Sequence, residues 1–127
     1  MFELTINSTV YQFNFGMGFL RAINKTIATD VDGVKDVKKN IGLRYTIALL
    51  MDGDVEALVD ILDFANKAYN PRVSRNELDA YIEKHENLDR LFEDVLDFLR
   101  KANATKKTVE SLQEAIEKEK AKEAATA

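Results

Sequence analysis

The spacing of apolar residues changes from two to about 3.6 near Gly16, and this change constrains the fold more than any other feature of the sequence. Before it, apolar and polar side chains alternate as they do in half-buried strands. The alternating apolar residues are Phe2, Leu4 and Ile6 in a first run and Tyr11, Phe13 and Phe15 in a second. A short polar stretch at residues 7–9 separates the runs, and its Asn tolerates a positive φ angle. We therefore predict an antiparallel hairpin over residues 2–15.

Beyond Gly16, apolar residues recur at three- and four-residue steps, as on amphipathic helices. The pattern predicts about five helices: one ending near Thr29, one from Leu43 to Met51, one from Val55 to Tyr69, one after Ser74 and one from Leu88 to Leu99. The third and fifth carry the clearest apolar stripes, so we expect Leu62 and Leu96 to be core residues. The predicted fold is mainly α (α+β), with an N-terminal hairpin packed on a helical bundle.

Two segments are expected to bury little. Residues 30–40 are rich in charged side chains and contain Gly33, which predicts a surface loop or a frayed turn. Residues 117–127 contain only Glu, Lys, Ala and Thr, which favours a frayed helix or a disordered extension. We divide the chain into a domain over residues 1–103 and a polar tail over residues 104–127. The domain is expected to remain folded without residues 106–127.

Composition argues against several classes of protein. A net charge of -4 does not favour binding to a phosphate backbone, so nucleic acid is not an expected partner. The chain has no cysteine, which removes disulfides and thiolate chemistry and fits a reducing compartment. No export signal is found at the N-terminus, and no run of 18 apolar residues predicts a membrane span. We therefore expect a cytoplasmic protein that does not bind a membrane.

No pattern of residues indicates catalysis or metal binding. His85 is the only histidine and lies among charged residues without a serine or cysteine partner, so we assign it no role. Residues 30–36 resemble part of a calcium loop, but Ile41 stands where a bidentate Glu is required. The segment Gly16-Met17-Gly18 lacks the remaining residues of a phosphate-binding loop. We expect no cofactor and a protein that is not an enzyme.

Four aromatic residues lie at the edges of the predicted apolar stripes and are candidates for contact with a partner protein: Phe13, Phe15, Tyr69 and Tyr81. The pattern leaves open whether each of them belongs to the core or to a contact surface.

Three segments carry a resemblance to a known family. They are Phe2-Glu3-Leu4-Thr5-Ile6-Asn7, then Tyr11-Gln12-Phe13-Asn14-Phe15-Gly16 leading to Phe19-Leu20-Arg21, and the stretch from Gly42-Leu43 through Gly53-Asp54 to Leu58-Val59-Asp60-Ile61-Leu62. In these segments and in the order of its elements, residues 1–103 resemble the tail assembly chaperones of long-tailed phages that infect Gram-positive bacteria.

The resemblance implies a protein that coats the tape measure protein in the host cell cytoplasm, keeps it soluble and is absent from the mature virion. It also implies a longer frameshifted form that recruits the tail tube protein. Coating a long rod favours repeated weak contacts, so we expect self-association. One alternative from another class stays open, a small phage-encoded regulatory or adaptor protein that binds a host factor.

Overall fold

The N-terminal segment forms the predicted hairpin in the computed structural model, which describes residues 1–126. Strand β1 (Phe2–Ile6) pairs antiparallel with β2 (Thr9–Phe13), with Phe2 opposite Phe13 and Ile6 opposite Thr9. The two turn residues, Asn7 and Ser8, have φ angles of 51° and 66°. Two successive positive φ angles give a type I′ turn, whose twist matches that of the strands it joins.

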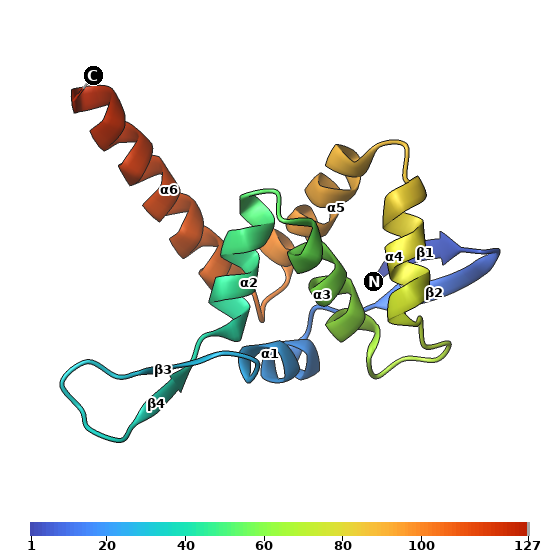
Figure 1. Ribbon diagram of the computed structural model, residues 1–127, viewed down its shortest axis with the longest axis horizontal. Coiled ribbons are helices and arrows are strands. Elements are labelled where there is room, and N and C mark those ends of the chain that lie inside the picture. The colour runs from blue at the N-terminus through green and yellow to red at the C-terminus, as the bar shows by residue number, and fades with distance from the viewer. Residues whose placement is uncertain (127) are drawn as a thin grey trace.

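Helices make up most of the rest of the described chain, which confirms the mainly α, α+β fold. The six helices are α1 (Met17–Asn24), α2 (Gly42–Met51), α3 (Val55–Asn66), α4 (Arg75–Lys84), α5 (Leu88–Lys101) and α6 (Lys106–Thr126). Helix α3 lies at the centre and packs against α1, α2, α4 and strand β2 (Figure 1). The hairpin and α4 lie on one side of α3, and α2 and α6 lie on the other (Figure 1).

Polar side chains fix where the central helices begin. The carboxylate of Asp54 accepts a hydrogen bond from the backbone N–H of Ala57 at 2.9 Å and caps α3. Ser74 and Glu77 form a capping box at the start of α4. These caps satisfy N–H groups that have no partner within their own helix.

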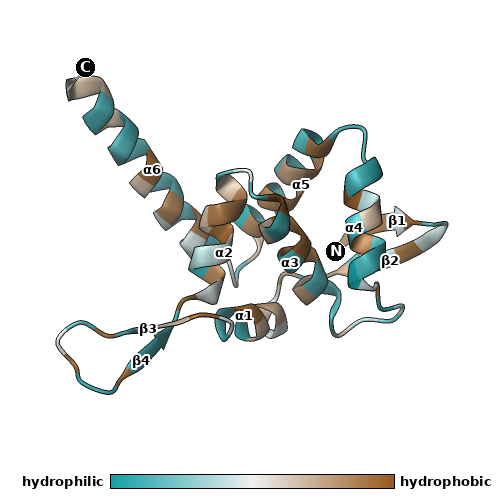
Figure 2. Ribbon diagram, in the orientation of Figure 1, coloured by the Kyte–Doolittle hydropathy of each residue, from teal (hydrophilic) through white to brown (hydrophobic). Residues whose placement is uncertain are grey.

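The core is continuous from the hairpin to the first turns of α6, and apolar segments face inward along α2 and α3 (Figure 2). On α3, Leu62 is completely buried, as predicted. On α5, the buried residues are Leu91, Val95 and Leu99. The prediction for Leu96 is wrong, because this side chain is only half-buried at the edge of the core.

A buried asparagine joins the hairpin to the helices. Asn66 donates two hydrogen bonds from Nδ2, to the carbonyl oxygens of Gln12 at 3.0 Å and Pro71 at 3.1 Å. Its Oδ1 accepts from the backbone N–H of Val73 at 2.8 Å and from Nη1 of Arg72 at 3.1 Å. One fully buried side chain therefore holds β2, the end of α3 and the loop before α4 together.

Residues 28–40, which we call the arm, differ from the prediction. Strands β3 (Ala28–Asp30) and β4 (Lys38–Asn40) form a second antiparallel hairpin instead of a loop, and it projects from the body (Figure 1). Helix α1 ends at Asn24 and not near Thr29. The hydroxyl of Thr26 donates to the carbonyl oxygen of Ile23 at 2.7 Å, so this residue closes the helix.

Helix α6 also differs from the prediction. Val109 and Leu112 are buried in the core, and Nη1 of Arg44 donates to the hydroxyl of Ser111 at 3.0 Å. Residues 106–112 therefore dock on the bundle, although the sequence analysis places them in the polar tail outside the domain of residues 1–103. From residue 113 to 125 the helix is exposed apart from the half-buried Ile116, and it projects away from the body (Figure 1).

Candidate functional site

An apolar groove of about 630 Å³ opens between the hairpin, the start of α1 and the end of α5. We call it the aromatic groove. It is lined by Met1, Phe2, Phe13, Asn14, Phe15, Gly16, Met17, Phe98, Lys101, Ala102, Asn103 and Ala104.

The floor of the aromatic groove follows from the register of the hairpin. Phe2 and Phe13 are opposite each other on adjacent strands, so both side chains lie on one face, and Phe15 follows Phe13 by two residues. Their ring centroids are 5.9 Å apart for Phe2 and Phe13, and 6.1 Å for Phe2 and Phe15. The same alternation that predicted the strands therefore gathers the aromatic rings.

The rim of the groove exposes large apolar side chains. Met1, Met17 and Phe98 are between 40% and 61% exposed. The Phe98 ring packs edge-on against Phe2, with 5.0 Å between centroids, and reaches to 6.4 Å from Phe15. Exposed apolar side chains grouped around a concave site are typical of surfaces that bind another molecule.

Lys101, the charged residue of the groove lining, forms an ion pair with Asp97 on its own helix. The ammonium of Lys101 donates to Oδ2 of Asp97 at 3.0 Å, and Arg100 donates to Oδ1 at 3.2 Å. The hydrogen bond from Lys101 holds the pKa of Asp97 below its ordinary value, so this carboxylate stays ionised. Because the rest of the lining is uncharged and largely apolar, the groove suits an apolar ligand better than an ionic one.

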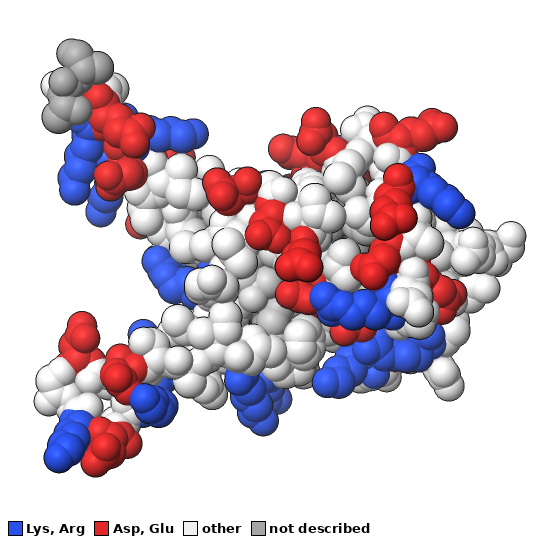
Figure 3. All heavy atoms as spheres, viewed as in Figure 1, with Lys and Arg blue, Asp and Glu red and all other residues white. Residues whose placement is uncertain are grey.

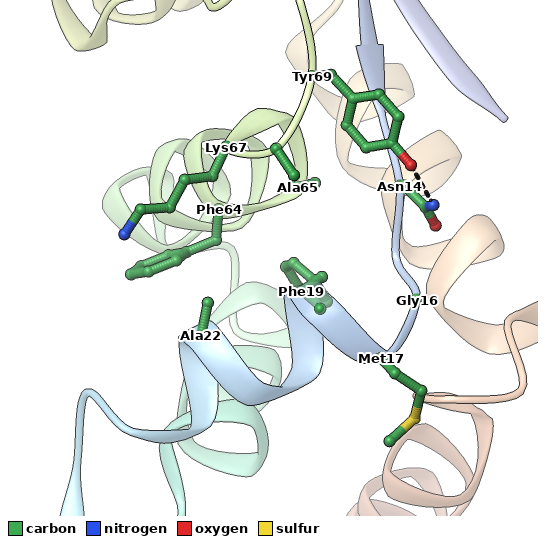
Figure 4. Close-up of a pocket in the computed structure, with 11 residues that line it drawn as sticks. Asn14, Gly16, Met17, Phe19, Ala22, Phe64, Ala65, Lys67 and Tyr69 are labelled. Atoms are coloured by element: carbon green, nitrogen blue, oxygen red, sulfur yellow. Dashed lines mark hydrogen bonds between the residues drawn. The ribbon is translucent and has the colours of Figure 1, made fainter.

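A smaller pocket of about 300 Å³ lies on the other side of residues 14–17, between α1 and the end of α3 (Figure 4). Phe19 and Ala22 line it from α1, and Phe64 lines it from α3. At its edge, Nδ2 of Asn14 donates to the hydroxyl of Tyr69 at 2.5 Å. This bond ties the segment between β2 and α1 to the residues that follow α3.

Tyr81 lies elsewhere, on α4. Its ring packs edge-on against that of His85, with 5.3 Å between centroids, and burial raises the pKa of its hydroxyl. It lines a hollow of about 600 Å³ with Ile6, Lys84 and other residues of the hairpin and α4.

The four aromatic candidates therefore fall into three places. Phe13 and Phe15 are buried, so their side chains form the floor of the aromatic groove and do not project toward a partner. Tyr69 borders the pocket of Figure 4, and Tyr81 lies on α4. Whether any of them contacts a partner stays a prediction.

Sequence reasoning missed the exposed rim of the groove. For Phe98 a signal was present, because this aromatic residue falls beside the stripe of Leu91, Val95 and Leu99, next to Asp97. An aromatic residue off the buried stripe of an amphipathic helix is a candidate for contact. Met1 and Met17 lie outside the regular elements or at their ends, where periodicity gives no signal.

Within residues 1–126 the structure holds no cluster of three or more His, Asp or Glu side chains suited to a metal ion. In the segment that resembled a calcium loop, Asp30 pairs with Lys38 across the arm.

His85 accepts a hydrogen bond at Nδ1 from the backbone N–H of Asn87 at 3.1 Å. The described helices also include none that is both long and apolar enough to cross a bilayer.

A comparison with known families matches residues 3–114 to the family described as phage tail assembly chaperone protein, TAC. The match covers most of the chain and runs from β1 to the buried first turns of α6. The chain belongs to this family. No curated protein and no solved structure matches it. The match confirms the family suggested by the sequence. As a tail assembly chaperone, the protein takes part in the assembly of a phage tail by binding tail proteins.

Proposed function

We propose that this chaperone binds apolar helical segments of the tape measure protein in the aromatic groove and keeps that protein soluble until the tail tube polymerises. The observation that carries the proposal is the rim of Met1, Met17 and Phe98, exposed above an aromatic floor. An amphipathic helix presents apolar side chains at steps of three and four residues, and a groove of this kind receives two or three of them.

The flexibility of the rim suits a partner with many similar segments. Methionine side chains are unbranched and adapt to ligands of different shape, and here two of them line the same groove as Phe98. A chaperone that meets different parts of a long rod needs such tolerance more than it needs tight affinity for one sequence. Many weak sites along one rod then gain strength from proximity.

The remaining parts of the proposal are what the resemblance to the tail assembly chaperones implies. Copies of the chaperone associate along the rod, a longer frameshifted form recruits the tail tube protein, and the chaperone leaves before the virion matures. It acts in the host cell cytoplasm by binding alone and catalyses no reaction.

Co-expression tests the proposal. The tape measure protein is produced alone, with the chaperone, and with the variants Phe98→Glu and Met17→Glu, which place a carboxylate at the apolar rim. Among these four samples, we expect soluble tape measure protein only with the unchanged chaperone, in a complex with many copies per rod by size-exclusion chromatography with light scattering.

A matched control uses Val10→Glu. Val10 is 48% exposed, close to the value for Met17, but it lies in β2 outside the groove lining. This variant should keep the tape measure protein soluble. Equal loss of solubility with all three variants would contradict the assignment of the groove. A tape measure protein that is soluble alone, or a complex with one copy, would favour the adaptor alternative.

A further inference from the structure

The pocket between α1 and the end of α3 borders the aromatic groove directly. Three residues line both hollows: Asn14, Gly16 and Met17. The segment that contains them is therefore the wall between the two. The pocket is the smaller hollow and its floor is apolar, because Phe19 is buried there and Ala22 and Phe64 are half-buried (Figure 4). A ligand held in the aromatic groove needs to cross only this wall to fill a second hollow.

The pocket differs from the aromatic groove in the charges around it. Lys67 lines the pocket, is exposed, and lies over the ring of Phe64 with 5.2 Å between its ammonium nitrogen and the ring centroid (Figure 4). Arg21 on α1 and Lys25 at its C-cap are exposed one helical turn apart, next to Ala22 of the pocket floor. Figure 3 shows Lys and Arg side chains gathered under α1 and the end of α3. Within residues 1–126, none of these three cations forms an ion pair.

The segments that form the pocket supply no carboxylate to balance these cations. Residues 14–27 contain no Asp or Glu. On α3, Asp60 and Asp63 are both paired with arginines that follow the helix. Residues 14–27 and 60–75 together carry five cations and two anions, a net charge of +3, in a chain whose net charge is -4. The positive charge around the pocket is therefore a local feature that runs against the charge of the whole protein.

We propose that the tape measure helix that enters the aromatic groove extends into this pocket and carries carboxylates at that end. An apolar side chain of the helix fills the pocket beside Phe19 and Phe64. Asp or Glu side chains on the next turn of the helix meet the three cations. Side chains three, four or seven residues apart on one face of a helix are about 5–10 Å apart, a spacing that lets one helix reach two adjoining hollows. The inference rests on the proposed function and names the chemistry of the segment that the chaperone selects.

The difference between the two hollows sets the direction in which a helix binds. The aromatic groove has one charged lining residue, Lys101, and it is paired with Asp97, whereas the pocket is bordered by the three cations. A helix with carboxylates at one end therefore fits the combined site in one direction. Complementary charges of this kind fix the register of a contact and disfavour wrong partners more than they raise its affinity. Copies bound to segments of the same pattern then point the same way along the rod.

Peptides from the tape measure protein test the inference. Overlapping peptides of about 20 residues, which as helices are about 30 Å long, cover its sequence, and fluorescence anisotropy measures their binding to the chaperone. Peptides whose binding is lost with Phe98→Glu are those that enter the aromatic groove. In each of these, the Asp and Glu residues beside the apolar stripe are replaced by Asn and Gln, which removes the charge and keeps the shape.

We expect the amide peptides to bind about fivefold more weakly than the acidic ones at low salt, because each exposed ion pair contributes little. Salt near 1 M, where the screening length is about 3 Å, should remove most of this difference. The variant that combines Arg21→Glu, Lys25→Glu and Lys67→Glu should reverse it and bind the amide peptides better. Peptides with lysines in place of the carboxylates should bind this variant more tightly than the unchanged chaperone, which a loss of folding would not allow.

A matched control changes three cations elsewhere, in the variant that combines Lys35→Glu, Lys39→Glu and Lys118→Glu. These lysines are exposed on the arm and on α6, and none of them forms an ion pair in the part of the chain that the structure describes. Both variants change the net charge by the same amount, so only a local effect separates them. The control should keep the preference for the acidic peptides.

Equal binding of acidic and amide peptides to the unchanged chaperone would overturn the inference, and so would an equal loss of preference in both variants. In either case, peptides that still depend on Phe98 would leave the proposed function standing without the second hollow. If no tape measure peptide depends on Phe98, the proposed function fails, and the inference fails with it.

Discussion

Replacing Asn66 by Asp changes one atom of a buried side chain and should destabilise the fold strongly. The amide Nδ2 donates to the carbonyl oxygens of Gln12 and Pro71, and an ionised carboxylate has no proton to offer either of them. An unpaired buried polar group costs about 1–3 kcal/mol, so two of them give a loss of about 2–6 kcal/mol. A domain of this size has a total stability of only about 5–15 kcal/mol, so the effect is large.

The prediction is tested by urea unfolding followed by circular dichroism. The slope of the free energy of unfolding against urea concentration should be the same for variant and unchanged protein, which shows that the compactness of their native and denatured states is also the same. Asn76→Asp is the matched control, because it makes the same chemical change on an exposed side chain in the first turn of α4. Its free energy of unfolding should stay within about 0.5 kcal/mol of the unchanged protein. A similar small effect for Asn66→Asp would refute the reasoning that this asparagine joins the hairpin to the helices.

Three further changes probe other parts of the fold. Gly42→Ala places a Cβ atom 2.0 Å from the carbonyl oxygen of Ile23, so α1 and α2 must separate, and we expect a loss of about 1–3 kcal/mol in urea unfolding. Deleting residues 106–127 should lower the melting temperature clearly because two buried side chains are lost, whereas deleting residues 117–127 should change it little. The pKa of Glu77 is held below its ordinary value of 4.5, mainly by a backbone hydrogen bond from Ser74. The stability that the Glu77 carboxylate adds is therefore present above pH 4.5 and is lost as the pH falls through the lowered pKa. Any excess in the free energy of unfolding of the unchanged protein over Glu77→Gln should therefore shrink at acid pH.

The parts of the fold that could be predicted are those in which the apolar pattern repeats often enough to define a face. The first hairpin shows six alternating apolar residues, and α3 and α5 show several turns of an apolar stripe. In these elements burial decides the conformation, and burial leaves a periodic trace in the sequence. The turn at Asn7 was also predictable, because its residue type accepts a positive φ.

The arm and α6 could not be predicted for a physical reason. Each strand of the arm has three residues, and none of them is buried, so no alternation exists to read. The fully buried apolar residues of helix α6 are Val109 and Leu112, and two apolar residues among charged ones do not reveal which partner covers them. The partner surface comes from α5, which directly precedes α6, and from α2, which is distant in the sequence.

The candidate site was half predictable for a related reason. Alternation assigned Phe13 and Phe15 to one face of the hairpin, and the structure places them on the floor of the aromatic groove. The alternation of apolar residues does not predict which side chains are buried at the floor of the groove and which are exposed at its rim, because their exposure depends on how far α5 lies from the strands. The end of α5 brings Phe98 over Phe2 and leaves the outer part of its ring exposed.

This division between floor and rim decides which substitutions can report on binding. Phe13 is completely buried, so its truncation would cost about 3–5 kcal/mol and lower the amount of folded chaperone before any partner is added. A loss of tape measure solubility in such a variant would report stability and not recognition. Phe98 is 40% exposed and forms the rim, so a substitution there removes apolar contact surface while most of the core remains intact. Only rim substitutions whose melting temperature matches that of Val10→Glu therefore separate the binding of a partner from the integrity of the fold.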